Sequence, residues 1–173
     1  MKAGCCVIRI YSIAIVAVML PGGAYGQALA IDKWTPALPT KAERRVADAV
    51  SWATAIADVA LDAKDSWDSE DRRRAFALQG VRVGVTYGAV FAVKTLVHRK
   101  RPCAPTSCGH DNPDFSFYSA HTALAFQTLG GPRLVFSLPL AVSTGGLRVA
   151  ANKHWLTDVL AGAAIGAATS RIR

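Results

Sequence analysis

Residues 148–158 read Arg-Val-Ala-Ala-Asn-Lys-His-Trp-Leu-Thr-Asp and place an imidazole, His154, four residues before a carboxylate, Asp158. On a helix, residues four apart share one face with Cβ atoms roughly 5–6 Å apart, so Asp158 could accept a hydrogen bond from one ring nitrogen. The other nitrogen would stay basic, and Arg148 could bind an anion through its fork of donors. The alternative is an ordinary surface salt bridge, because acid–base pairs at this spacing are common.

The composition favours one helical domain with an anionic partner. The 173 residues are enough for one domain with a hydrophobic core and too few for two ordinary ones. Aromatic residues make up only 8% while alanine and glycine are abundant, which favours closely packed helices over a sheet. The formal net charge of +8 suits nucleic acid, an anionic membrane surface or a phosphorylated small molecule. Nucleic acid has little support, because the basic clusters are not interleaved with aromatic residues.

The N-terminus has the layout of a secretory signal peptide. Two basic residues precede an apolar run at 10–20, which is followed by Pro-Gly-Gly and by a small-x-small sequence ending at Gly26. We therefore expect residues 1–26 to be a signal peptide and 27–173 to form a single helical domain. That domain would be exported to the periplasm of a Gram-negative bacterium, in association with the inner membrane or free of it. An uncleaved anchor is the alternative, although Pro-Gly-Gly interrupts the run short of the ~20 apolar residues that a span needs.

Cys103 and Cys108 lie in a proline-containing loop of the expected mature chain. In an exported protein a local disulfide is the favoured state of such a pair. It would constrain the unfolded chain by roughly 2 kcal/mol in the loop-entropy description. Zinc is the alternative, because His98 and His110 flank the cysteines and could complete a set of four ligands.

The remaining pattern predicts an all-α fold, a compact bundle of about five helices. A capping box, Thr40-x-x-Glu43, opens the first helix, which we expect to be a solvent-exposed cover with a charged outer face. Pro102 stops the second helix near residue 100. Alternating apolar and polar residues, as in a strand, occur nowhere at useful length. The expected helices lie at about 40–65, 69–100, 120–129 and 133–150, with a last one containing Gly162 and Gly166.

Glycine recurs at every fourth position of the second expected helix, as Gly80, Gly84 and Gly88. Glycine costs about 1 kcal/mol relative to alanine inside a helix, so a regular series indicates a groove that another helix approaches closely. The last helix repeats this spacing with Gly162 and Gly166. We therefore expect these two helices to pack against each other along their glycine faces.

Two further groups of polar residues are candidates for anion binding. Lys94 and Arg101 are seven residues apart, so a continuous helix would place them on one face, roughly 10 Å apart along its axis. The run 98–101, His-Arg-Lys-Arg, can also be read as a solvated basic cluster at a helix C-terminus. Ser119 suits the N-cap of the next helix, whose first amides are a ready anion site beside His121. A capping serine next to an incidental histidine is the alternative there.

In chain order the three groups are Lys94-x6-Arg101-Pro102, Ser119-x-His121 and Arg148-x5-His154-x3-Asp158. This order resembles the three-part signature of the type 2 phosphatidic acid phosphatase superfamily, which also includes bacterial class A acid phosphatases and vanadium haloperoxidases. The resemblance covers about 65 residues. Two departures stand out: Tyr118 and Ala120 replace the proline and glycine of the usual Pro-Ser-Gly-His, and Leu147 replaces the serine of the usual Ser-Arg.

The resemblance implies a metal-independent phosphatase without a cofactor. By position, His154 resembles the nucleophile that forms a phosphohistidine, Asp158 the carboxylate that orients it, and His121 the general acid. The expected phosphate-binding residues are Lys94, Arg101, Ser119, Ala120 and Arg148. The substrate would be a phosphorylated small molecule, a lipid phosphate or a pyrophosphate. The alternatives are a vanadate-dependent haloperoxidase on the same fold and a non-catalytic basic helical protein that binds anionic lipid.

Overall fold

The computed structural model describes residues 30–34, 37–104 and 108–172, and it places helices but no strands among them. The elements are η1 (Ala30–Trp34), α2 (Lys41–Asp68), α3 (Arg72–Val97), α4 (Ala120–Gln127), η2 (Thr128–Gly130), α5 (Leu134–Ala150) and α6 (Leu156–Thr169). The predicted all-α bundle of about five helices is confirmed for this part of the chain. The expected signal peptide, residues 1–26, lies outside the described residues.

Local sequence patterns account for several helix ends. The capping box of α2 is present: the Glu43 N–H donates to Thr40 Oγ1 at 3.1 Å, and the Thr40 N–H donates to Glu43 Oε2 at 3.0 Å. α2 then continues to Asp68, past the expected end near residue 65. α3 ends at Val97, before the expected end near residue 100, because His98 takes a left-handed conformation with φ 47°.

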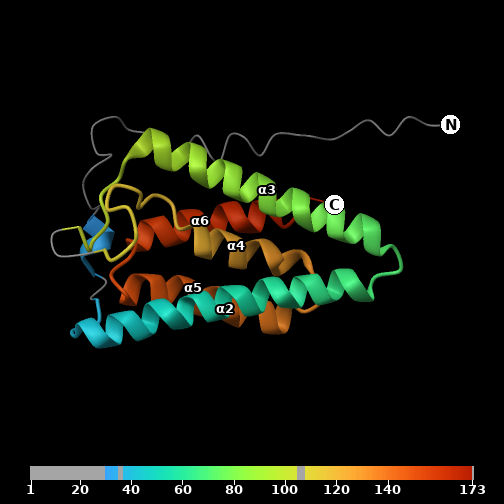
Figure 1. Cartoon of the computed structure of the whole chain (residues 1–173), viewed down its shortest axis with the longest axis horizontal. Coiled ribbons are helices and arrows are strands. Elements are labelled where there is room, and N and C mark those ends of the chain that lie inside the picture. The colour runs from blue at the N-terminus through green and yellow to red at the C-terminus, as the bar shows by residue number, and fades with distance from the viewer. Residues whose placement is uncertain (1–29, 35–36, 105–107, 173) are drawn as a thin grey trace.

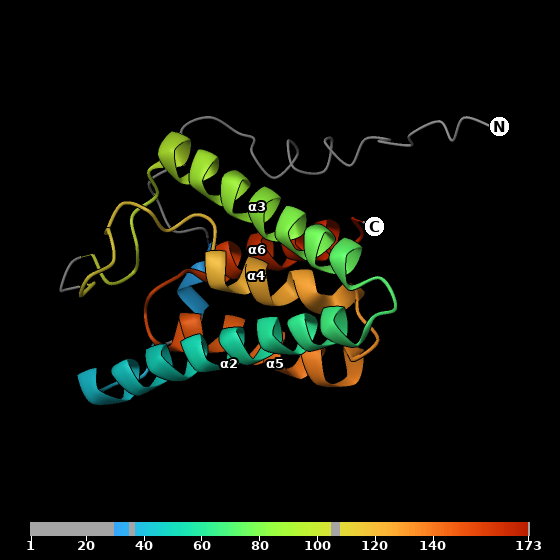
Figure 2. The same ribbon diagram turned by 45° about the vertical axis from the view of Figure 1, so that its right-hand side comes forward.

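The helices pack as two pairs, α2 beside α5 and α4 beside α6. α3 lies across α4 and α6 (Figure 1), and the turned view in Figure 2 shows the same arrangement. Successive helices run in alternating directions along the bundle. The N-terminal ends of α2, α4 and α6 therefore gather at the same end of the molecule as the C-terminal ends of α3 and α5 (Figure 1).

The glycine faces do not pack as expected. In α3, a Cβ built on Gly80, Gly84 or Gly88 would meet nothing within 4 Å, so this face points outward. In α6, a Cβ on Gly162 would lie 2.6 Å from the carbonyl oxygen of Ser119 at the start of α4. The predicted packing of these two helices along their glycine faces is therefore wrong, because the glycines of α6 allow its close approach to α4 instead.

The side chains of α2 are distributed with apolar groups outward and polar groups inward. Its buried residues include Ser51, Asp58 and Asp62, whereas Ile56 is 62% exposed and Trp52 is 49% exposed. The expectation of a charged outer face is therefore wrong for the middle of this helix, where polar residues pack inward on the bundle; the exposed charged residues lie near its two ends. The exposed large apolar residues of α3, α5 and α6 are Phe76, Val81, Val85, Tyr87, Phe91, Leu96, Leu134, Val135, Phe136, Leu138, Val142 and Leu160.

α3 is the one described helix that is long and apolar enough to cross a membrane, judged by length and composition; α5 and α6 are apolar but shorter. Its 26 residues correspond to about 39 Å, against roughly 30 Å for the hydrocarbon core of a bilayer. Arg82 is the only charged residue between Arg74 and Lys94. It donates to both carboxylate oxygens of Asp62 at 3.0 Å, so it faces α2 and leaves the outer face of α3 uncharged.

Candidate active site

The expected site residues gather at the end of the bundle where α4 and α6 begin and α3 and α5 end. They come from the last turn of α3 (Lys94), the loop after it (Arg101), the start of α4 (Ser119, Ala120, His121), the last turn of α5 (Arg148), the loop before α6 (His154) and the first turn of α6 (Asp158). The antiparallel topology thus brings three separate sequence groups to one place. The contacts among these residues determine the chemistry that the site can support.

His154 lies in the loop that precedes α6, and not on a helix as the sequence suggested, because α6 begins only at Leu156. Its Nδ1 is 3.6 Å from Oδ2 of Asp158, which is an ion-pair distance rather than a hydrogen bond. Its Nε2 is 3.2 Å from Nη1 of Arg101. Because a guanidinium can only donate, we infer that Nε2 is the acceptor and that the ring proton is on Nδ1, facing Asp158.

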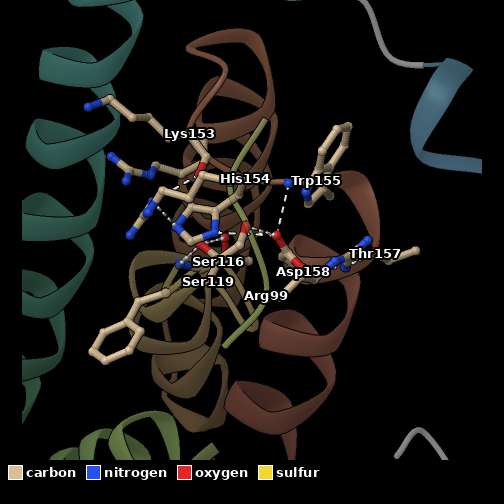
Figure 3. A network of polar contacts seen from close by, with 12 residues as sticks. Arg99, Ser116, Ser119, Lys153, His154, Trp155, Thr157 and Asp158 are labelled. Carbon is tan, nitrogen blue, oxygen red and sulfur yellow. Dashed lines mark hydrogen bonds and ion pairs between the residues drawn. The ribbon is translucent and has the colours of Figure 1, made fainter. Parts of the chain in front are cut away.

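Asp158 is fully buried and held by three donors. Arg99 donates to Oδ1 at 2.6 Å, while the Ser116 hydroxyl and the Trp155 N–H, the latter at 2.9 Å, donate to Oδ2 (Figure 3). Arg99 and Ser116 were not predicted, since neither belongs to the spaced motif. These donors fix the carboxylate independently of the histidine, so His154 meets an acceptor that is already oriented.

Arg99 is held from its other side by Asp32 of η1. Its Nη2 is 2.6 Å from Oδ2 of Asp32, and the Thr157 N–H donates to Oδ1 of Asp32 at 3.0 Å. The reading of 98–101 as a solvated cluster is wrong for two of its members, because Arg99 is 6% exposed and Arg101 is 7% exposed. The helix stops at residue 97, so in the segment 98–101 every second residue points inward. This alternation could not be predicted while the segment was assumed to be helical.

Two carboxylates that the sequence analysis did not single out neutralise the arginines of the site. Arg148 is 1% exposed and pairs with Asp48 of α2, and its Nη2 lies 3.8 Å from Oδ2 of Asp111. Arg101 lies 4.0 Å from the same oxygen and donates to the backbone carbonyl of Lys153 at 2.9 Å. Both arginines are therefore buried, fixed and paired with acidic side chains.

Lys94 and Ser119 have local partners. Lys94 donates from Nζ to the carbonyl oxygen of Phe115 at 2.5 Å. Ser119 caps α4, as predicted, by accepting from the N–H of Thr122 at 3.4 Å. Its own N–H donates to the carbonyl oxygen of Asp158 at 3.0 Å, which ties the start of α4 to α6. Contact of either residue with a phosphate stays a prediction.

His121 faces α2. Its ring lies edge-on to that of Trp52, with the centroids 4.0 Å apart. Both ring nitrogens are buried, and neither has a hydrogen-bond partner in the described part of the chain. Buried polar atoms without partners are rare, so these nitrogens have unused hydrogen-bonding capacity. In the chain next to this site, Tyr118 is fully buried in an apolar cluster against which Ala120 packs, although the Tyr118 hydroxyl has no hydrogen-bond partner in the described part of the chain.

Cys103 and Cys108 form a disulfide. They are therefore not thiolates, and the zinc alternative loses two of its four ligands. The other two, His98 and His110, are exposed. Among the residues that the structure describes, no group of three or more histidine, cysteine, aspartate or glutamate side chains is arranged to hold a metal ion.

The model of one protein family, described as the PAP2 superfamily, matches residues 76–173. These are 98 of the 173 residues, and they include all three motif groups. No curated protein and no solved structure matches the chain. Asp32, Asp48 and Trp52 precede the matched region, so their place at the site follows from the structure alone.

Arg99→Gln should lower the free energy of unfolding by about 3–5 kcal/mol, because two buried carboxylates, Asp32 and Asp158, lose their shared cation. Chemical denaturation in mild detergent measures the change. The matched control is Lys64→Gln, which removes an exposed ion pair with Asp68 and should change the stability by less than about 0.5 kcal/mol. Equal effects of the two substitutions would contradict the buried network.

Proposed function

The chain belongs to the PAP2 superfamily, whose members are generally phosphatases, and on that basis we propose that it hydrolyses a phosphomonoester through a phosphohistidine intermediate. The observation that carries the proposal is the environment of His154. One ring nitrogen faces a fixed carboxylate, and the lone pair of the other accepts from Arg101 at 3.2 Å, so a bound phosphate must take over this donor before Nε2 attacks. A nucleophile oriented by a carboxylate and surrounded by anion-binding groups suits attack on phosphorus.

In the proposed reaction, Nε2 of His154 attacks the phosphorus, an N–P bond forms and the P–O bond to the alcohol breaks. Asp158 stabilises the positive charge that the ring acquires, because the Nδ1–H faces its carboxylate. Arg101 and Arg148 hold the equatorial oxygens as negative charge develops on them. Water then cleaves the N–P bond, which releases phosphate and restores the neutral histidine.

His121 is proposed to donate a proton to the departing alkoxide and then to accept one from the attacking water. The support is that both of its ring nitrogens are buried without partners in the described part of the chain. Burial and the nearby Arg148 lower the pKa of His121 to about 3, so the role requires the bound phosphate dianion to raise that pKa. The groups proposed to complete the phosphate site are Lys94, Ser119 and the amides at the start of α4 from Ala120 onward. The fixed cations supply the charge that a metal ion supplies in other phosphoryl-transfer sites, so the mechanism uses no cofactor.

We further propose that the protein is exported, lies in the inner membrane and acts on a lipid phosphate. Members of the superfamily are often membrane-associated or exported. The support from this chain is the outward apolar surface of α2, α3 and α5, which lies between the charged residues at the two ends of α2 and α3. Soluble monomers rarely expose continuous apolar areas larger than a few hundred Å². With these surfaces against acyl chains, the site would lie near the lipid headgroups.

His154→Ala should reduce the turnover of a chromogenic phosphomonoester by at least about 1,000-fold, because the nucleophile is lost. The assay is run in EDTA with purified protein in detergent, so that hydrolysis does not depend on added metal. His110→Ala, which removes an exposed imidazole from the loop after the disulfide, is the control and should retain activity. Substantial turnover by the His154 variant would refute the proposed intermediate.

The acid limb of the pH profile should lie well below pH 6.5. Burial, together with Arg101 and Arg148, lowers the pKa of His154 well below its ordinary value of about 6.5. A lowered pKa keeps the ring neutral and nucleophilic as the pH falls below 6.5. After correction for ionisation of the substrate, kcat/KM should therefore stay high in this pH range. Arg101→Gln removes one cause of the shift and should move the limb toward higher pH. A limb near 6.5 in the unsubstituted protein, or no movement in the variant, would contradict this assignment.

Membranes that contain the protein should retain it through an alkaline carbonate wash and release it only into detergent, because acyl chains rather than charges would hold the bundle. Immunoblots of supernatant and pellet measure the distribution. Release by carbonate would place the protein on the surface or in solution and would remove the support for a lipid substrate. It would leave the test of phosphomonoester hydrolysis unaffected.

A further inference from the structure

A cavity of about 340 Å³ opens beside the candidate active site, and most of the charged residues that line it are cations. Its charged lining residues are Lys41, Arg44, Arg45, Lys153 and Asp48. Four cations against one carboxylate give the lining a net charge of +3. None of the proposed catalytic residues lines the cavity, so it is a separate space that begins where Lys153 adjoins His154 in the chain.

Two carboxylates join this cavity to the active site. Asp48 pairs with Arg148 through Oδ1 and lies 3.4 Å from Nζ of Lys153 through Oδ2. Oδ2 of Asp111 lies 2.8 Å from Lys153 and 3.8 Å from Arg148. Each carboxylate therefore reaches a cation of the active site and a cation of the cavity at once. A ligand with two adjacent anionic groups can span the same two cations.

The disulfide loop and α2 hold the walls of the cavity in place. Cys103 and Cys108 both line it, and the carbonyl oxygen of Cys108 accepts a hydrogen bond from Nζ of Lys153 at 2.8 Å. Arg44, which also lines the cavity, donates to the carbonyl oxygen of Leu38 at 2.9 Å. Two of the cations are thus positioned by backbone groups, which lowers the entropy cost of binding an anion to them.

We propose that this cavity is a second phosphate-binding subsite, which takes a phosphate group next to the one that reacts. The inference rests on the proposed function, because that function assigns the reacting phosphate to Arg148. Arginine and lysine together suit phosphate, which accepts several charge-assisted hydrogen bonds at once. The phosphate can come from a diphosphate substrate or from the headgroup of a neighbouring lipid, since the cavity lies at one end of the apolar surface.

The test uses the double variant Lys41→Gln/Arg45→Gln, which removes two exposed cations of the cavity without touching the active site. Arg73→Gln/Arg74→Gln is the matched control, because it makes the same charge change in the first turn of α3, at the other end of the bundle (Figure 1). Hydrolysis of a chromogenic phosphomonoester is inhibited with orthophosphate or with inorganic pyrophosphate, in detergent, in EDTA and at low ionic strength. A second series adds phosphatidylglycerol to the micelles.

We expect the inhibition constant of pyrophosphate to rise about tenfold in the cavity variant, and that of orthophosphate to rise less than about threefold. The control variant should leave both constants within about twofold of the unsubstituted protein. This result assigns the subsite to a second phosphate of the substrate. If pyrophosphate inhibition is unchanged and a response of activity to phosphatidylglycerol is lost in the cavity variant alone, the subsite belongs to a lipid headgroup.

The proposal is overturned if the cavity variant changes neither the inhibition by pyrophosphate nor the response to phosphatidylglycerol. It is also overturned if the inhibition constants of pyrophosphate and orthophosphate rise by the same factor, since the cavity cations would then act on the reacting phosphate. Failure of the proposed function looks different. If the unsubstituted protein does not hydrolyse the monoester, calorimetric titration with pyrophosphate still compares the two variants. Loss of pyrophosphate binding in the cavity variant alone would then support an anion site in a protein that is not a phosphatase.

Discussion

The burial of Asp158 is the constraint on which the active-site end of the molecule depends. An ionised carboxylate inside a protein costs several kcal/mol unless charged or hydrogen-bonded partners surround it. Its partners come from the segment after α3 (Arg99), the segment before α4 (Ser116) and the start of α6 (Trp155). These segments must therefore meet before the carboxylate can be buried. Their meeting also brings His154 beside a fixed acceptor, so the site is ordered before any ligand arrives.

Between its two charged ends the bundle is held by buried polar contacts as well as by a small apolar cluster. Thr86 of α3 donates to Gln127 of α4 at 2.8 Å, and its hydroxyl lies 3.0 Å from that of Thr169 in α6. The hydroxyls of Thr54 and Thr144 join α2 to α5 at 2.8 Å. Hydrogen bonds of this kind and close glycine contacts are the means by which helices associate in an apolar solvent. Because polar and small residues fill much of the interior, many large apolar side chains lie on the outer surface.

The sequence predicted those features that depend on neighbouring residues. The capping box at Thr40 involves residues three apart, and it marks the start of α2 correctly. The glycine spacing in α6 correctly indicated a close helix approach, but the partner, α4, is set by the tertiary arrangement. The ion pair between Asp32 and Arg99 joins residues 67 positions apart, so no local sequence pattern predicts it. The three spaced motifs did lead to the correct family. Their order and spacing are those of residues that meet at one site, and this holds even where the secondary structure around them was predicted wrongly.

The acidic side chains around Arg148 affect which anions the proposed site can accept. A guanidinium that is 1% exposed cannot rely on water, so Asp48 and Asp111 balance its charge while no substrate is bound. An incoming anion must then displace carboxylates rather than water molecules. A singly charged anion gains little from this exchange, because it replaces one unit of charge by another. A phosphate dianion brings more charge and more acceptor oxygens, so the carboxylates that weaken binding overall also favour phosphate over monoanions.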